Sequence, residues 1–132
     1  IMKKLELFAL VVVMTLLCVS CKNKNDVYST PEKVMTEFIP AYLTADFESM
    51  FKYTVPTDAV LLRNIQKMLR EHPDRLQKLQ QTEVTIEKMS SKFVNDTLAI
   101  CTCDFTADNE KSSTEFRVKK IDGKWLVEMS EN

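Results

Sequence analysis

One short stretch near the end of the sequence constrains the fold more than any other. Between Glu115 and Met129, two alternating apolar runs flank the dipeptide Asp122-Gly123. An Asp-Gly pair between such runs is typical of a two-residue type I′ turn, because both turn residues must adopt a positive φ. Gly123 is the only glycine in the chain. The stretch therefore predicts a β-hairpin.

The turn also fixes the register of this predicted hairpin. One face would carry the cross-strand pairs Lys120–Trp125, Val118–Val127 and Phe116–Met129. On the other face, Arg117 would lie opposite Glu128 and could form an ion pair with it. One face of the hairpin is therefore largely apolar, and the rest of the chain must cover it.

Length and composition restrict the classes of protein that are possible. A chain of 132 residues with 45% hydrophobic and 28% charged residues is typical of one globular domain that folds without disulfides or metal. A net charge of −1 gives no basic surplus, so a nucleic-acid partner is not expected. The single histidine, His72, has no partners at metal-binding spacing. The sequence therefore predicts no metal and no cofactor.

The N-terminus has the anatomy of a secretion signal. Lys3 and Lys4 precede an apolar run from Leu7 to Leu17, which is shorter than a membrane span needs. The run ends in Cys-Val-Ser-Cys, which resembles the bacterial lipobox, and this resemblance implies acylation of Cys21. We expect residues 1–20 to be the signal peptide.

Two alternatives to this interpretation remain open. Cys18 stands where the lipobox usually has leucine, and if Cys18 were itself the acylated residue, the large Leu17 would lie at the cleavage site. Residues 1–20 could also form an uncleaved anchor with incidental cysteines. Acylation at Cys21 is favoured, because the small residue Ser20 precedes it at the cleavage site. Two or three acyl chains would give stable membrane attachment.

The residues after the proposed cleavage site bear on localisation. Residues 21–29 are polar and without periodicity, so we expect a tether followed by one domain at residues 30–132. Lys22 rather than aspartate follows Cys21, which argues against retention in the inner membrane of a Gram-negative bacterium. Asp26 is the only acidic residue nearby. The periplasmic face of the outer membrane is therefore expected rather than the cell surface.

The first half of the predicted domain is helical. Thr30-Pro31-Glu32 is typical of a helix start, and Pro40 is expected to kink that helix or end it early. Asp46 can cap a second short helix and Asp58 a third, from about Ala59 to Glu71, followed by further turns over residues 75–81. The apolar residues predicted to face inward are Val34, Met35, Phe38, Tyr42, Phe47, Met50, Phe51, Leu61 or Leu62, Ile65, Met68, Leu69, Leu76 and Leu79. The charges between them suit a solvated helix face rather than a basic patch.

The second half alternates as strands do. Residues 83–94 predict a first strand with a bulge at Ser90-Ser91, and Asn95-Asp96 a turn. The second strand, residues 97–106, is apolar on both faces, so we expect it to be central and covered on both sides. With the C-terminal hairpin, these strands make a four-stranded antiparallel meander. Helices followed by strands indicate an α+β domain.

Four segments carry a resemblance to a known family. The segments are T-P-E-K-V at Thr30, A-D-F-E-S-M-F at Ala45, V-N-D-T-L-A-I at Val94, and K-K-I-D-G-K-W-L-V at Lys119. In this order they resemble small bacterial lipoproteins whose domain, of unknown function, has the nuclear-transport-factor-2-like (NTF2-like), or cystatin-like, fold. The resemblance implies a curved sheet around helices, forming a cone with a pocket. That superfamily includes isomerases, dehydratases and non-catalytic binding modules, so the fold alone does not decide the function.

The implied pocket would lie between the sheet and the helices. The residues expected to line it are aromatic or aliphatic: Phe38, Tyr42, Phe51, Phe116, Val118 and Trp125. Tyr42, Tyr53 and Asp46 are the nearest candidates for acid–base catalysis, but their spacing equally suits core tyrosines and a helix cap. We therefore assign no catalytic residue.

Two further motifs have both a chemical and a structural interpretation. Cys101 and Cys103 would point to the same side of a strand about 7 Å apart, too far for an unstrained disulfide. They could bind a soft metal or act in redox chemistry, although two small apolar core residues are the preferred interpretation. Asp96-Thr97-Leu98 matches a pattern that some Gram-negative bacteria O-glycosylate at the threonine, but it also suits an ordinary turn.

Three hypotheses for function follow. The first is a non-catalytic, membrane-anchored envelope lipoprotein that binds a small apolar ligand or a protein partner. The second is a small-molecule lyase or isomerase that uses the cone pocket. The third is a structural or accessory subunit of an envelope complex.

Overall fold

Residues 24–130 are described by the structure, a computed structural model in which helices precede strands. In chain order the elements are η1 Lys24–Tyr28, α2 Pro31–Leu43, α3 Phe47–Tyr53, η2 Pro56–Asp58, α4 Ala59–Arg70, α5 Pro73–Gln80, β1 Val84–Asn95, β2 Leu98–Ala107, β3 Glu110–Ile121 and β4 Lys124–Glu128. The predicted signal peptide and Cys21 lie outside the described residues. None of the helices within residues 24–130 is long and apolar enough to cross a membrane.

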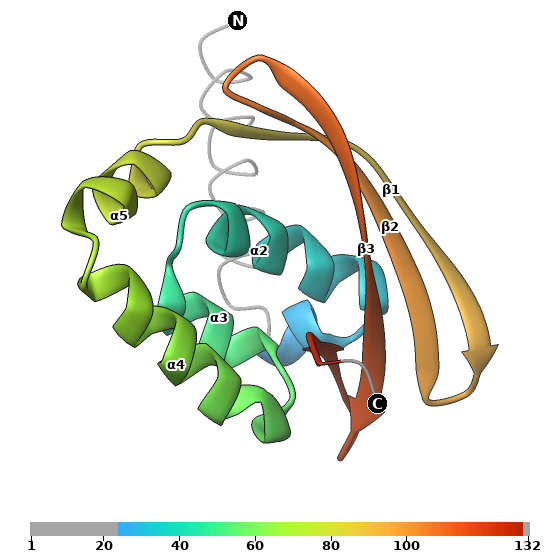
Figure 1. Ribbon diagram of the computed structural model, residues 1–132. Helices are drawn as coiled ribbons and strands as arrows, with labels where there is room; N and C mark the ends of the chain where they lie inside the picture. The colour runs from blue at the N-terminus through green and yellow to red at the C-terminus, as the bar shows by residue number, and fades with distance from the viewer. Residues whose placement is uncertain (1–23, 131–132) are drawn as a thin grey trace, which may run out of the picture.

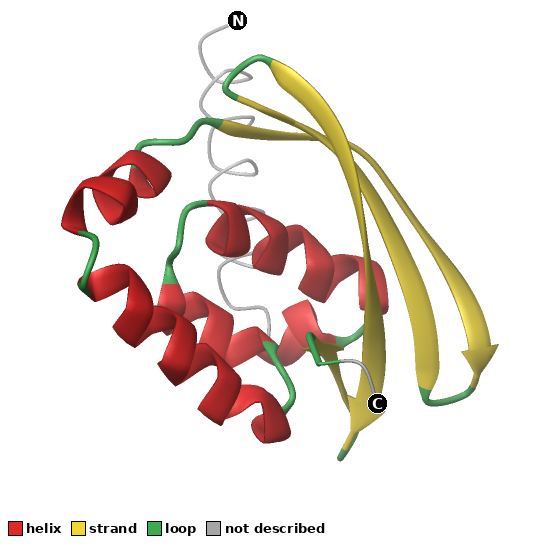
Figure 2. Cartoon of the chain, viewed as in Figure 1, coloured by secondary structure: helices red, strands yellow, loops and turns green. Residues whose placement is uncertain are grey.

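The strands form one antiparallel meander in the order β1-β2-β3-β4. The sheet is curved, and helices α2 to α5 lie on one side of it (Figures 1 and 2). Helix α2 packs directly on the sheet, while α3, α4 and α5 follow one another further out. The α+β class and the four-stranded meander predicted from the sequence are confirmed.

The C-terminal hairpin forms as predicted around its turn. Asp122 and Gly123 have φ values of 51° and 80°, as a type I′ turn requires. The predicted pairs Lys120–Trp125, Val118–Val127 and Arg117–Glu128 are all present. The predicted Phe116–Met129 pair is wrong, because β4 ends one residue before Met129.

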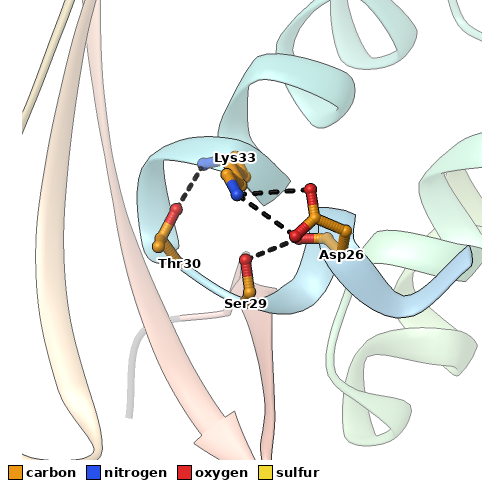
Figure 3. Close-up of polar contacts among 4 residues, drawn as sticks. All are labelled: Asp26, Ser29, Thr30 and Lys33. Carbon is orange, nitrogen blue, oxygen red and sulfur yellow. Dashed lines mark hydrogen bonds and ion pairs between the residues drawn. The ribbon is translucent and has the colours of Figure 1, made fainter. Parts of the chain in front are cut away.

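The first helix begins at the predicted cap and passes through its proline. The Thr30 side chain accepts a hydrogen bond from the Lys33 backbone N–H at 3.1 Å, as Figure 3 shows. Pro40 does not end the helix, which continues to Leu43. Residues on both sides of Pro40, Ile39 and Ala41, are buried. Their packing offsets the backbone hydrogen bond that the proline removes.

Helix α4 buries a narrower stripe than the sequence predicts. Leu62 is fully buried and Leu69 is 9% exposed, but Met68 is 52% exposed, so its inward placement is wrong. Helix α4 packs mainly between α3 and α5 and lies away from the sheet. Only one line of its side chains therefore reaches the core.

Within residues 24–130, helices cover only one face of the strand β2. Ala99, Cys101 and Cys103 are fully buried on the face toward the helices, whereas Leu98 and Ile100 on the other face are half-buried. The prediction that both faces are covered is therefore wrong. No element of the described chain lies over the outer face, which the apolar character of Leu98 and Ile100 alone could not reveal.

The predicted bulge in β1 lies elsewhere. Ser90 and Ser91 pair regularly with Thr102 and Cys101, while the register shifts between Ile86 and Lys88 and again between Phe93 and Asn95. The irregular positions are therefore Glu87 and Val94. The serine pair was a poor marker because small polar residues fit a regular exposed strand equally well.

The end of the predicted tether is folded onto the domain. Residues 24–28 form the short helix η1, and the Tyr28 ring packs 5.9 Å from the ring of Tyr53 while its hydroxyl donates to the Lys52 carbonyl at 3.3 Å. Figure 3 shows the Lys33 ammonium donating to the Asp26 carboxylate, at 3.2 Å to each oxygen. The tether assignment is therefore wrong for residues 24–28, since tyrosine packing holds them in place.

A candidate binding groove at the open edge of the sheet

The strand β3 is longer than its neighbour β4. Residues 117–121 of β3 pair with β4, whereas residues 110–116 pair with β2 on one side and with no described strand on the other. Five of these seven residues are exposed. This half of β3 is therefore an open sheet edge, and we call residues 110–116 the β3 edge.

A buried carboxylate explains why β4 stops where it does. Asp58 is 1% exposed, and its carboxylate accepts hydrogen bonds from the Met129 N–H at 2.6 Å and from the Ser130 hydroxyl. The Met129 N–H, like the Val127 carbonyl, faces away from β3, so Asp58 holds the chain after Glu128 on that side and Ser130 does not continue the ladder toward Glu115. Asp58 was predicted to cap α4, but its side chain makes no capping hydrogen bond there.

The outer side of β4 is not open. Thr54 forms a parallel bridge with Val127, and the Val55 N–H donates to the Val127 carbonyl at 2.9 Å. The chain before η2 therefore covers β4, and the open part of this sheet margin is confined to the β3 edge.

A groove of about 640 Å³ lies where β4 ends and the β3 edge begins. Its lining comes from α2, β2, β3, β4 and the C-terminal segment: Tyr42, Ile100, Thr114, Glu115, Phe116, Arg117, Glu128, Met129 and Ser130. We call it the edge groove. Because it runs round the strand margin, it combines backbone groups of an open edge with side chains from both faces of the sheet.

One wall of the edge groove is aromatic. The Phe116 ring lies 5.2 Å from the rings of both Phe38 and Tyr42, edge to face in each case. Tyr42 is 39% exposed, whereas Phe38 behind it is fully buried. Such ring pairs each stabilise the cluster by roughly 1 kcal/mol beyond the buried area. Tyr42 and Phe116 therefore form a rigid apolar wall with a polar hydroxyl.

The opposite wall is charged. Glu128 is 7% exposed, and its carboxylate oxygens lie 2.6 Å from Lys119 Nζ and 3.2 Å from Arg117 Nε. The Arg117 Nε and Glu128 Oε1 atoms are close but not aligned for a hydrogen bond. Two cations thus surround one carboxylate, and the carboxylate of Glu115, which also lines the groove, balances the formal charge.

The six predicted pocket residues do not line one cavity. Tyr42 and Phe116 line the edge groove. Phe38 and Val118 are fully buried and Trp125 is 5% exposed, so all three are packed in the core between sheet and helices. Phe51 is partly buried against the same core. A ligand could reach the buried three only if the core opened.

The candidate catalytic side chains have structural partners. Asp46 caps α3 by accepting from the Ser49 N–H at 3.3 Å and from the Ser49 hydroxyl at 2.8 Å. Burial, and then the negative charge of Glu37, raises the pKa of Tyr53. The buried carboxylates Asp58 and Glu128 have the partners given above, and neither is bonded to a tyrosine. The carboxylate–tyrosine pair that would favour a lyase or isomerase is therefore not found among residues 24–130.

The paired cysteines are buried free thiols. Burial, and then the charge of Glu32, raises the pKa of Cys101 to about 12, while burial and Asp104 raise the pKa of Cys103. Both thiols are therefore protonated near neutral pH, and thiolate is the form that binds metal and reacts. Residues 24–130 contain no group of three or more His, Cys, Asp or Glu placed to hold a metal ion.

Thr97 lies in the exposed turn between β1 and β2. Its hydroxyl donates to the Asn95 side-chain oxygen at 3.1 Å, and its N–H donates to the same oxygen at 2.9 Å. The turn interpretation accounts for this geometry. Exposure leaves the hydroxyl accessible to modification.

Sequence reasoning missed Asp58 and the β3 edge. Asp58 precedes a helix and was taken as a cap, although Pro56 two residues earlier begins a separate helical turn. A comparison of strand lengths could have revealed the β3 edge. The strand before the Asp122-Gly123 turn extends back to Glu110, whereas the strand after the turn has only five residues to pair with it.

No family model matches the chain, and no curated protein matches it. Among solved structures, it is similar to a Campylobacter jejuni protein that is provisionally described as an NTF2-like transpeptidase. The TM-score is 0.56 at 20% sequence identity, and the match covers 77% of this chain and 100% of the other. At this identity the similarity shows the fold alone, and the domain has the NTF2-like cone fold.

Proposed function

We propose that this protein is a non-catalytic envelope lipoprotein that binds a protein partner at the edge groove. The observation that carries the proposal is a regular open strand edge beside an aromatic wall formed by the exposed Tyr42 and the half-buried Phe116. An edge strand offers unpaired backbone N–H and C=O groups to an incoming strand, and neighbouring side-chain pockets select among partners.

A protein partner is favoured over a small apolar ligand by the packing of the core. Phe38, Val118 and Trp125 fill the space where an NTF2-like pocket was expected. The edge groove, in contrast, combines backbone groups, an aromatic wall and the Arg117–Glu128 pair. This mixture suits a peptide better than a purely apolar molecule.

Binding is tested by incorporating a photo-cross-linking amino acid at Tyr42 in the full chain in cells. We expect adducts with a protein at Tyr42 and none at Val60, a matched control that is 63% exposed on α4. The adduct should weaken when Phe116→Ala removes half of the aromatic wall. Adducts with lipid alone, or equal adducts at both positions, would contradict the proposal.

The proposed attachment is through acylated Cys21, at the periplasmic face of the outer membrane. The support is the lipobox-like sequence before Cys21 and the lysine after it. Cys21→Ala should move the protein from the membrane to the soluble fraction and remove the acyl mass, whereas Cys18→Ala should do neither. Retention of acylation in Cys21→Ala would overturn the assignment.

We also propose Thr97 as an O-glycosylation site, supported by its pattern and its exposure. Intact-mass spectrometry of protein from its native host should show a glycan mass that Thr97→Ala lacks. An unmodified wild-type mass would rule the modification out.

A further inference from the structure

We propose that the partner of the β3 edge is a second copy of this chain, paired antiparallel about a two-fold axis at Ser113. This inference rests on the proposed function, because it names one partner for the same groove. The backbone pattern of β3, the charges along this strand and the shape of the edge groove at its end all suit such a pairing.

The backbone pattern shows which residues can bond outward. The turn at Asp122-Gly123 makes Ile121–Lys124 the first hydrogen-bonded pair, so odd-numbered residues of β3 direct their N–H and C=O away from β2. In agreement, the backbone N–H of the even-numbered residue Lys120 donates a hydrogen bond to the Thr97 carbonyl, on the β2 side, at 2.8 Å. Lys111, Ser113 and Glu115 therefore present unpaired backbone groups at the β3 edge.

The charges along the edge are self-complementary. With Ser113 opposite Ser113 of a second copy, Lys111 lies opposite Glu115 and Glu115 opposite Lys111. All three are exposed odd-numbered residues on the outer face of the sheet. The hydrogen-bonded pairs of the new ladder are thus the same pairs that bring opposite charges together.

Neighbouring registers are less favourable. Sliding by two residues in one direction places Lys111 opposite Arg117, which repels it, and leaves Glu115 opposite Ser113. Sliding in the other direction places Lys111 opposite Ser113 and Glu115 opposite Asn109. Only the register centred on Ser113 forms two opposite-charge pairs without a like-charge pair.

The edge groove accommodates the end of the second strand. In this register Glu110 of the second copy lies opposite Phe116, and its β2–β3 turn reaches the place where β4 ends. That turn is exposed and contains Asp108, which would approach the cations Arg117 and Lys119. Each copy thus fills the groove of the other.

The test uses the full, membrane-anchored chain with the substitution Ser113→Cys. After mild oxidation, the amount of disulfide-linked dimer is measured on a non-reducing gel. Antiparallel hydrogen-bonded partners have Cα atoms about 5.5 Å apart, within reach of a disulfide. We expect a dimer band that is missing without Ser113→Cys. A matched control, Lys92→Cys on the outer edge of β1, should give none.

Charge reversal then tests the register. Lys111→Glu and Glu115→Lys should each lower the dimer yield at least about 5-fold, and the double variant should restore it. Mixing the two single variants, made with tags of different size, should give a heterodimer, because each copy then supplies what the other lacks. Restoration between chains cannot arise from altered folding of one chain.

Unchanged yields in the single variants, or no heterodimer on mixing, would overturn the inference. If Ser113→Cys fails to cross-link while the Tyr42 probe still traps a different protein, the second-copy inference fails and the proposed function stands. If neither probe traps a protein, both fail.

Discussion

The two edges of the sheet are built differently. β1 is irregular at Glu87 and Val94 and carries Lys88 and Lys92, which are devices that discourage another strand from pairing. β3 pairs with β2 in unbroken register from Leu98–Lys119 to Ala107–Glu110 and continues past β4 without a bulge. One edge is protected, and the other is open and regular.

Edge protection in this sheet therefore depends on local backbone geometry rather than on polarity. Both edges carry charged residues, so composition does not distinguish them. On β1 the register shifts break the ladder pattern that a second strand would need. On β3 the pattern is intact, and its charges match a strand of the same sequence.

The largest expected effect comes from Asp58, which keeps the end of β4 away from the β3 edge. Asp58→Ala leaves the Met129 N–H and the Ser130 hydroxyl without their acceptor, so we expect a loss of about 3 kcal/mol in the free energy of unfolding. Urea denaturation measures it. Asp74→Ala, at an exposed position in α5, should cost less than about 1 kcal/mol.

The Asp58→Ala variant should also change the pairing at the β3 edge. Once Met129 and Ser130 are released, Ser130 can pair with Glu115 and occupy its outward backbone groups, so dimer formation through Ser113→Cys should fall as well. A stability loss below about 1 kcal/mol for Asp58→Ala would show that another contact ends β4.

A smaller effect concerns the strand between the two edges. Burial raises the pKa of Cys101 to about 12 from an ordinary value of 9.0, so the unfolded state loses this proton first as pH rises. The free energy of unfolding should therefore be unaffected by this thiol below about pH 9 and should fall as the pH rises toward 12. The fall should exceed that of the Cys101→Ala variant by on the order of 2 kcal/mol. Urea unfolding of both proteins between pH 8 and 11 measures the difference. Parallel curves would contradict the assignment.

Proline should give the β3 edge the protection that β1 has. The Ser113 N–H points outward, so Ser113→Pro removes no bond to β2 and should cost about 1 kcal/mol while abolishing self-association. Thr114→Pro removes a bond to β2 and should cost about 3 kcal/mol. Native mass spectrometry and urea unfolding give the two readouts. Equal costs at both positions would contradict the backbone pattern.

The smallest effect is expected on β1. Val94 is 54% exposed at an irregular position, so Val94→Lys should change stability by no more than about 0.5 kcal/mol and leave self-association unchanged. Urea unfolding and the Ser113→Cys cross-link measure these quantities. A loss above about 1 kcal/mol would mean that another surface covers the β1 edge.

Much of the fold could be predicted from the sequence because its signals are local. The Asp122-Gly123 turn fixed the hairpin register, and Thr30 and Asp46 marked helix starts that the structure confirms. The features that were missed depend on contacts distant in sequence. Asp58 bonds to residues more than seventy positions away, which no local pattern encodes.

The candidate site was predicted less well than the fold. Tyr42 and Phe116 line the edge groove together, but Phe38, Val118 and Trp125 fill the core. An apolar residue facing inward looks the same in the sequence whether its neighbours leave space or fill it. Only packing decides between a pocket wall and a core.

The docking of η1 sets a distance as well as a contact. If Cys21 carries the lipid, three chain steps separate it from Lys24, where η1 begins, and these span at most about 11 Å. Beyond that point Tyr28 and the Asp26–Lys33 pair hold the chain to the domain. The domain would therefore stand at a fixed, short height above the bilayer. Two such copies would search for each other in a thin layer, where even a weak edge contact forms readily.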